Sequence, residues 1–235
     1  CDPHGCREIN KSHDKIDHFN EQRLSKYSTP TYRGENIADL QQKATGGDST
    51  SLYLLGLINE KGLANQSHNL LKAHSYYCRA AAAGSLDGSF KCGAMTIEGK
   101  GETRDFPKGL SQLTNAASSG NPLANWYLGV LFDSGKYVEQ NSSEAFSYFT
   151  KAAELGVVDA YNNLGLMYLT GRGTVADPYK GKVNLENAAE RDVTVAQKAL
   201  GLAYARGLMG IPYDLNEARK WLSIVANKGD LEAKK

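Results

Sequence analysis

The chain has 235 residues, of which 41% are hydrophobic and 23% are charged, as is usual for a folded protein. Its formal net charge of +1 gives no support for binding to nucleic acid or to an anionic membrane. No apolar run approaches the roughly 20 residues that a membrane-spanning helix needs. The length allows one or two domains, or one elongated array.

Residues 1–33 are polar and charged and have no periodic apolar pattern, so we expect a tail or an irregular N-terminal segment. The segment contains two cysteines and three histidines, which are residue types that zinc uses. The stretch "CDPHGC" lacks a standard finger spacing, so surface histidines and a small Cys1–Cys6 disulfide are the interpretation that we favour over a metal site. Cys1 also permits a lipid anchor of the kind found in mature bacterial lipoproteins.

Residues 34–47 contain "NIADLQQKATGG", which has the pattern of the second helix of a helical pair whose first helix is missing. We therefore predict a capping helix for this range.

From residue 48 onward one pattern recurs along the chain. In "AYNNLGLMYLTGRG", Ala160, Leu164, Gly165 and Tyr168 fall on one face of a helix. The same frame places central glycines at Gly56, Gly93, Gly129, Gly165 and Gly201, with steps of 37, 36, 36 and 36 residues. A fixed period in this range indicates stacked structural repeats.

A second helical segment follows each central glycine. These segments end in "AAAAG", "AASSG", "AAELG", "AAERD" and "VANKG", so glycine supplies a left-handed cap in four of the five. We therefore predict an all-α chain of five helix–turn–helix units at residues 48–84, 85–120, 121–156, 157–192 and 193–229. Residues 230–235 would begin a sixth unit.

Glycine in the middle of a helix costs about 1 kcal/mol relative to alanine. We expect Gly165 to be compensated by close approach of a neighbouring helix, which only a small residue allows. We interpret Gly171 to Gly173 as a tight turn. A phosphate loop would need a preceding strand and a following Lys-Ser or Lys-Thr pair, and the sequence has neither.

The pattern A-x-x-x-L-G-x-x-Y-x-x-G-x-G, followed by a helix ending in A-A-x-x-G, resembles the Sel-one-like repeat family, which is related to tetratricopeptide repeats. The resemblance covers residues 48–229. Ser51 and Gly88 replace the leading alanine of the first two units, and Cys92 replaces the leucine of the second. The resemblance implies a right-handed α/α superhelical solenoid that binds a protein or peptide partner in its concave groove.

The groove of such a solenoid is lined by the first helix of each unit. By this resemblance, the position two residues before the Leu-Gly leucine faces the groove, and it is occupied by Tyr53, Phe90, Trp126, Asn162 and Lys198. Flanking groove positions include Glu60, Asp87, Asp133, Leu166, Leu169 and Arg206. Their mixed charges suit a protein partner better than nucleic acid. Packing between units is the alternative role of the three aromatic side chains.

Cys78 and Cys92 each lie seven residues from Ser85, the expected centre of the turn between their helices. Two antiparallel helices would place these cysteines at the same level, where a disulfide is geometrically allowed. A pair of buried thiols is the alternative. A disulfide favours an oxidising location, either the periplasm or the exterior of the cell.

The sequence offers no candidate catalytic residue and no cofactor motif. We find no nucleophile motif, no repeated carboxylate pair, no metal-ligand pair at helical spacing and no histidine after His74. We therefore expect a scaffold or adaptor that is not an enzyme. The alternative is an immunity protein that neutralises a secreted toxic effector. A β-lactamase-like activity, proposed for cysteine-rich relatives, would need a nucleophile that we do not find.

Overall fold

The computed structural model of the protein describes residues 37–63 and 66–229. The whole of the expected N-terminal segment, with Cys1 and Cys6, and the start of a sixth unit lie outside the described residues. The chain divides into two compact units, Cys1–Ala116 and Ala117–Lys235.

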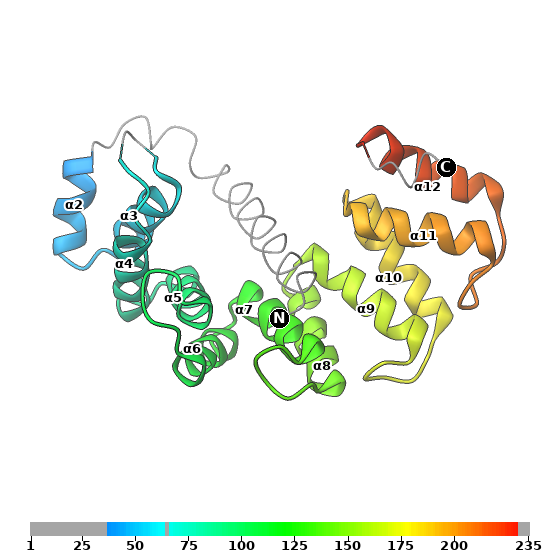
Figure 1. Ribbon diagram of the computed structural model, residues 1–235, viewed down its shortest axis with the longest axis horizontal. Helices are drawn as coiled ribbons and strands as arrows, with labels where there is room; N and C mark the ends of the chain where they lie inside the picture. The colour runs from blue at the N-terminus through cyan, green and yellow to red at the C-terminus, as the bar shows by residue number, and fades with distance from the viewer. Residues whose placement is uncertain (1–36, 64–65, 230–235) are drawn as a thin grey trace. The chain divides into compact units, whose positions relative to one another are not determined.

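The described residues form 11 α-helices and no strand (Figure 1), in agreement with the all-α prediction. Apart from α2, every helix has 13 residues. The helices are α2 (Ile37–Thr45), α3 (Ser49–Lys61), α4 (Leu70–Ala82), α5 (Leu86–Glu98) and α6 (Phe106–Ser118), then α7 (Pro122–Ser134), α8 (Ser142–Glu154), α9 (Val158–Thr170), α10 (Pro178–Glu190), α11 (Thr194–Arg206) and α12 (Leu215–Asn227). The boundary between the two units falls near the end of α6.

Local sequence signals set the ends of these helices. Asn69, Asn141 and Asp177 each accept a hydrogen bond from the backbone N–H three residues later, which satisfies one of the unpaired donors of the first turn. The first helices end at glycines in the left-handed conformation, such as Gly171 with φ 68°. Asp192 adopts φ 69° at the one second-helix end where the sequence lacks glycine.

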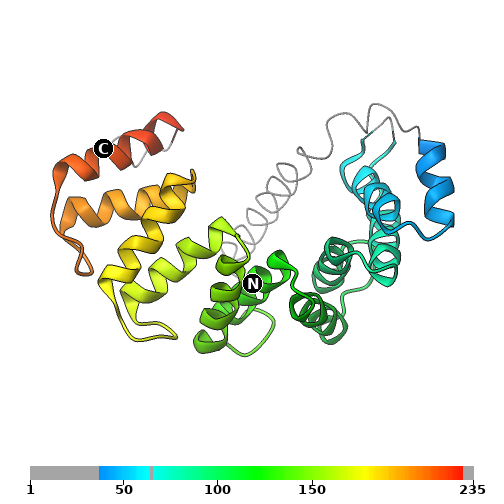
Figure 2. The same cartoon turned by 180° about the vertical axis from the view of Figure 1, so that it is seen from behind.

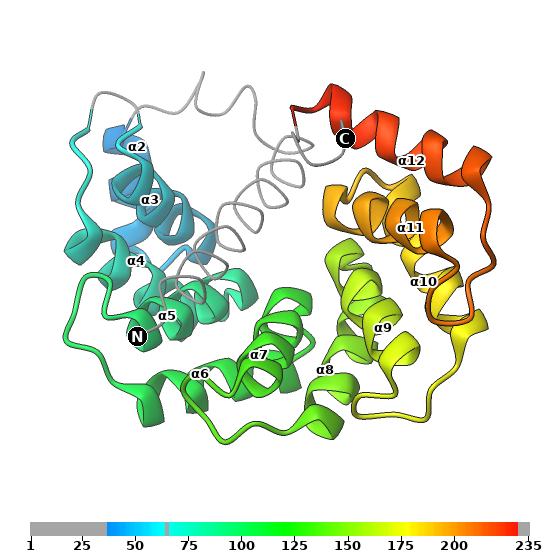
Figure 3. The ribbon, with the colours of Figure 1, turned by 45° about the vertical axis from the view of Figure 1, so that its right-hand side comes forward.

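Within each unit, consecutive helices pack as antiparallel pairs, and successive pairs stack on one another. In unit 2, α9 packs on α10 and α11 packs on α12, while α10 also contacts α11 (Figure 3). In unit 1, α3 packs on α4 and α4 contacts α5 (Figure 2). Helix α2 covers α3 through the buried side chains of Leu40 and Ala44. Each unit is therefore a stack of helical hairpins with a continuous apolar core.

A side chain of the partner helix packs directly against the central glycine of each first helix. A Cβ atom on Gly165 would lie 2.7 Å from Leu185 Cγ on α10, and one on Gly129 would lie 2.7 Å from the Phe149 ring on α8. Gly56, Gly93 and Gly201 meet Tyr77, Leu113 and Leu222 in the same way. A larger residue at these positions would force the partner side chain to shift out of a close-packed contact.

The second glycine of the G-x-G turn makes a different contact, between hairpins. A Cβ atom on Gly173 would lie 2.1 Å from the carbonyl oxygen of Ser142, which is the first residue of α8 in the preceding hairpin. Gly101 stands in the same relation to Leu70 at the start of α4. These turns therefore need glycine because the backbone of the preceding hairpin touches them, and phosphate binding is not required to explain them.

No helix in the described ranges is long and apolar enough to cross a lipid bilayer.

We predict that Gly165→Ala lowers the free energy of unfolding by about 1–3 kcal/mol, because the added methyl group overpacks the contact with Leu185. Helix propensity alone would change stability by about 1 kcal/mol in the opposite direction. Urea denaturation followed by circular dichroism measures the difference. In a Leu185→Ala background the same substitution should cost less, because the atoms that it meets are gone. An unchanged or higher midpoint for Gly165→Ala would contradict the packing assignment.

Candidate functional site

A disulfide joins the first two hairpins of unit 1. Cys78 on α4 and Cys92 on α5 are bonded with Sγ–Sγ 2.03 Å and Cα–Cα 4.9 Å. The expectation that these cysteines lie at the same level of two antiparallel helices is therefore confirmed. Cys92 is buried and Cys78 is half-buried.

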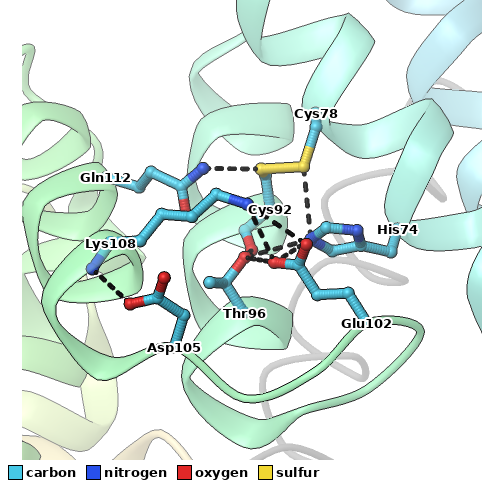
Figure 4. Close-up of polar contacts among 8 residues, drawn as sticks. All are labelled: His74, Cys78, Cys92, Thr96, Glu102, Asp105, Lys108 and Gln112. Carbon is cyan, nitrogen blue, oxygen red and sulfur yellow. Dashed lines mark hydrogen bonds and ion pairs between the residues drawn. A yellow bond between two sulfur atoms is a disulfide. The ribbon is translucent and has the colours of Figure 1, made fainter.

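A cluster of polar side chains surrounds this disulfide (Figure 4). His74 lies one turn before Cys78 on α4, and its Nε2 is 3.3 Å from Cys78 Sγ. The same nitrogen lies 3.0 Å from Thr96 Oγ1 on α5 and 3.2 Å from Glu102 Oε1 in the turn after α5. Three elements thus bring an imidazole, a hydroxyl and a carboxylate to one side of the sulfur atoms.

Glu102 is held in place from several sides. Thr96 Oγ1 donates to Glu102 Oε1 at 2.7 Å, and Lys108 Nζ pairs with Glu102 Oε2 at 3.1 Å. The residue before it, Gly101, has φ +83° and lies against the backbone at Leu70, so the turn passes directly beside the start of α4. This path of the turn places the Glu102 carboxylate next to His74. On the far side of the disulfide, Gln112 Nε2 donates to Cys92 Sγ at 3.2 Å.

The environment sets the protonation of His74 and Glu102. Burial lowers the pKa of His74 below its usual value, and the charge of Lys108 acts in the same direction, although Glu102 opposes them. Burial raises the pKa of Glu102, but the hydrogen bonds from Thr96 and Lys108 outweigh it, so that the net direction is downward. Near neutral pH the site holds a neutral imidazole and a carboxylate. Because a carboxylate only accepts, we assign the imidazole proton to Nε2.

The expectation that the sequence holds no metal-ligand pair at helical spacing is wrong. His74 and Cys78 are four residues apart on one helix, so a pair of metal-ligand residue types at helical spacing does exist. The ligand atoms of His74, Cys78 and Cys92 lie within 4.8 Å of one another. The spacing H-x-x-x-C is the sequence signal for the pair of His74 and Cys78. Nothing in the sequence pattern connects Glu102 with these two residues.

The three aromatic residues predicted for the groove are buried. Tyr53, Phe90 and Trp126 are 5%, 0% and 5% exposed. The ring of Tyr53 packs at 5.4 Å from that of Tyr77, and Trp126 Nε1 donates to Asn163 Oδ1 at 3.2 Å. The burial favours the packing alternative for all three.

Three of the predicted flanking residues also take part in internal contacts. Leu169 is buried in the core of unit 2 and packs against Gly181 on α10, which corrects its assignment to the groove. Glu60 pairs with Lys91 Nζ at 3.2 Å. Asp133 pairs with Arg172 at 3.2 Å, and burial raises the pKa of its carboxyl despite that positive charge.

Four other predicted residues remain at least partly accessible on two first helices of unit 2. Asn162, Leu166 and Lys198 are half-buried, and Arg206 is exposed. Asp87 of unit 1 is half-buried as well. We call Asn162, Leu166, Lys198 and Arg206 the α9/α11 face.

The hairpins, their central glycines and their turn glycines together define an all-α helical-repeat solenoid. The family model "Sel1 repeat" matches residues 49–85, 122–157, 158–193 and 194–230, which is more than half of the chain. The chain therefore belongs to the Sel1 repeat family, whose members are generally non-enzymatic protein-interaction scaffolds. Residues 86–121 are not among the matched ranges, yet α5 and α6 pair through Gly93 and Leu113 as in the other hairpins.

Several solved structures are similar to this chain. A protective antigen with an SLR fold from uropathogenic Escherichia coli is 27% identical, with a TM-score of 0.78 over 86% of this chain and 43% of its own length. This chain thus spans less than half of that relative. A Sel1 repeat protein from Oxalobacter formigenes is 25% identical, with a TM-score of 0.73 over 84% of this chain and 86% of its own.

An immunity protein from Pseudomonas aeruginosa shares the fold, with 20% identity and a TM-score of 0.55 over 81% of this chain and 72% of its own. Among curated proteins, no sequence matches this chain significantly.

We predict that the Cys78–Cys92 bridge contributes about 3 kcal/mol to the free energy of unfolding, because it closes a loop with a separation of 14 residues. The oxidised protein and the Cys78→Ala/Cys92→Ala variant should differ by this amount in urea denaturation. Alkylation of the unreduced, denatured protein should leave both cysteines unlabelled. Labelling of either residue before reduction would contradict the bridge.

We predict that His74 makes the oxidised protein less stable as the pH falls. The folded-state pKa of His74 is lowered, so below about pH 6.5 the unfolded chain takes up the proton first and the free energy of unfolding decreases. Urea denaturation at neutral pH and near pH 5 measures this loss. It should be smaller in His74→Gln and unchanged in His68→Gln, whose histidine is exposed. A loss of equal size in all three proteins would exclude the assignment.

Proposed function

We propose that this chain is a scaffold that binds a protein or peptide partner through the α9/α11 face. The general role of Sel1 repeats as interaction scaffolds supports the class of function. The α9/α11 face lies on first helices, and the groove is predicted to lie on the first helices as well.

The observation that carries the proposal is the side chain of Asn162. Its Oδ1 is buried and has no hydrogen-bond partner within the described parts of the chain. A buried acceptor without a partner is destabilising, and native structures rarely leave one unless water or a ligand satisfies it. The amide of Asn162 offers an acceptor and two donors, which match the N–H and C=O of a peptide group.

The neighbouring residues define the chemistry of the face. Asn163 Oδ1 accepts the hydrogen bond from Trp126 Nε1, which links Trp126 on α7 to α9. Leu166 adds an apolar contact beside Asn162, and Lys198 and Arg206 add positive charge from α11. A peptide or protein surface with backbone donors and acidic side chains complements this arrangement.

For the location, we propose an oxidising compartment, the periplasm or the exterior of the cell. The Cys78–Cys92 disulfide supports this proposal, because such bonds are rare where cellular thiols are kept reduced. Anchoring through Cys1 concerns a residue outside the described ranges.

The second candidate function is neutralisation of a secreted toxic effector by direct occlusion. The immunity protein from Pseudomonas aeruginosa with the same fold motivates this candidate. Deleting the gene should then make the host sensitive to an effector of neighbouring cells, and the purified chain should inhibit that effector at equimolar ratio. A deletion strain with unchanged resistance would exclude this function and leave the adaptor role.

We predict that Asn162→Ala weakens partner binding about tenfold, which corresponds to about 1.4 kcal/mol, the usual size of a hydrogen bond lost at an interface. The partner is first captured from the native host on the immobilised wild-type chain, and the affinities are then measured by calorimetry. Asn184→Ala is the matched control, because the Asn184 amide lies on the second helix α10 and bonds to Lys180 O. Equal binding by both variants would exclude the α9/α11 face.

A further inference from the structure

The cluster around the disulfide contains polar side chains that a covalent crosslink does not need. Two sulfur atoms are sufficient to join α4 to α5. Yet His74 Nε2 lies 3.3 Å from Cys78 Sγ, and Glu102 Oε1 lies 3.2 Å from the same nitrogen. The His74 residue is 7% exposed and the Glu102 carboxylate is held by Thr96 and Lys108, so contacts within unit 1 fix both groups.

These four side chains are the ligand types of a tetrahedral zinc site: two thiolates, one imidazole and one carboxylate. They come from α4, α5 and the turn after α5, and Figure 4 shows the imidazole and the carboxylate on the same side of the sulfur atoms. We propose that reduction of the Cys78–Cys92 bond converts this cluster into a Zn²⁺ site formed by Cys78, Cys92, His74 and Glu102.

The conversion takes place in two steps, and electrons and protons balance in each. A dithiol reductant transfers two electrons and two protons, so the bond between the two Sγ atoms breaks, two thiols form, and the reductant becomes a disulfide. Zn²⁺ then displaces the two thiol protons and the His74 Nε2 proton to water and bonds to the two thiolates and Nε2, together with the Glu102 carboxylate. Nδ1 takes up one proton, so that the imidazole stays neutral, and the metal keeps its oxidation state throughout.

The geometry requires only a local change. Zn–S bonds of about 2.3 Å in a tetrahedral arrangement place two sulfur atoms about 3.8 Å apart. Two bonded sulfur atoms lie closer together than this, so the two Sγ atoms must move apart after reduction. Because Cys78 and Cys92 lie on different helices, rotation about their Cα–Cβ bonds can provide the extra separation while α4 and α5 remain packed.

The surroundings suit the charge of the complex. Zn²⁺ with two thiolates, one carboxylate and a neutral imidazole has a net charge of −1. Lys108 Nζ, 3.1 Å from Glu102 Oε2, supplies the compensating positive charge. Gln112 Nε2 already donates to Cys92 Sγ at 3.2 Å, and a thiolate at that position is a stronger acceptor than a disulfide sulfur.

The site is also accessible from one side. The Glu102 side chain is 25% exposed and Cys78 is half-buried, whereas His74 and Cys92 are buried. Cys78 and Glu102 therefore form the accessible side of the cluster, from which a reductant and the metal ion would approach.

The test compares the oxidised and reduced forms in a Cys1→Ser/Cys6→Ser background, which removes the other two thiols. The protein is reduced with dithiothreitol, freed of reductant by anaerobic gel filtration, and titrated with Zn²⁺ in competition with a chromophoric chelator. Co²⁺ serves as a second probe, because its thiolate charge-transfer absorption reports sulfur ligands. We expect one Zn²⁺ per reduced chain and none per oxidised chain.

Variants identify the ligands. His74→Gln, Cys92→Ser and Glu102→Gln should each weaken Zn²⁺ binding by the reduced form at least about tenfold. The matched control His68→Gln replaces an exposed histidine outside the cluster and should bind as the background protein does.

Several outcomes would overturn the proposal. They are the absence of stoichiometric Zn²⁺ on the reduced chain, equal binding by the oxidised chain, and unchanged binding by His74→Gln. Loss of helical circular dichroism on reduction that Zn²⁺ does not restore overturns it as well. Unchanged binding by Glu102→Gln would overturn the four-ligand assignment.

Discussion

The structure depends on one repeated contact, the close approach of two helices at a central glycine. At Gly129 and Gly165 the missing Cβ atom leaves room for Phe149 and Leu185 of the partner helix, and a larger residue would force these side chains to move. The glycine weakens its own helix by about 1 kcal/mol. The apolar side chain seated against it recovers more than this through burial and dispersion contacts across the hairpin. The stability lost within the glycine-containing helix is recovered through its contacts with the partner helix.

Stacking of hairpins relies on a second set of close contacts. Gly173 and Gly101 let the turn of one hairpin touch the backbone at the start of the second helix of the preceding hairpin. At the first junction the Cys78–Cys92 bond adds a covalent link between α4 and α5. The same junction holds the cluster of His74 and Glu102, so the stacking geometry that builds the core also assembles the one group of reactive side chains described above.

Much of the fold could be predicted from the sequence, because a pattern that is weak in one copy becomes strong evidence when it recurs at a fixed spacing. One glycine inside a helix is ambiguous, but five at steps of 36 or 37 residues, each followed by a small-residue helix end, define hairpins. The disulfide was predictable for a related reason, since Cys78 and Cys92 are equally distant from one turn. The groove was less predictable. Periodicity shows which face of a helix Tyr53, Phe90 and Trp126 share, but it does not show whether a neighbouring side chain covers that face.

The sequence by itself determined the all-α class, the five hairpins, the role of the central glycines and the equal level of Cys78 and Cys92, because all of these are expressed in spacing along one chain. Only the tertiary structure decided that Leu169 packs inside a hairpin, that the Asn162 acceptor is left without a partner in the described parts, and that Glu102 lies beside His74. The physical reason is that these facts depend on where a turn or a neighbouring helix passes in space. The turn at Gly101 and Glu102 follows its path because it touches the backbone at Leu70, which is 31 residues earlier in the chain.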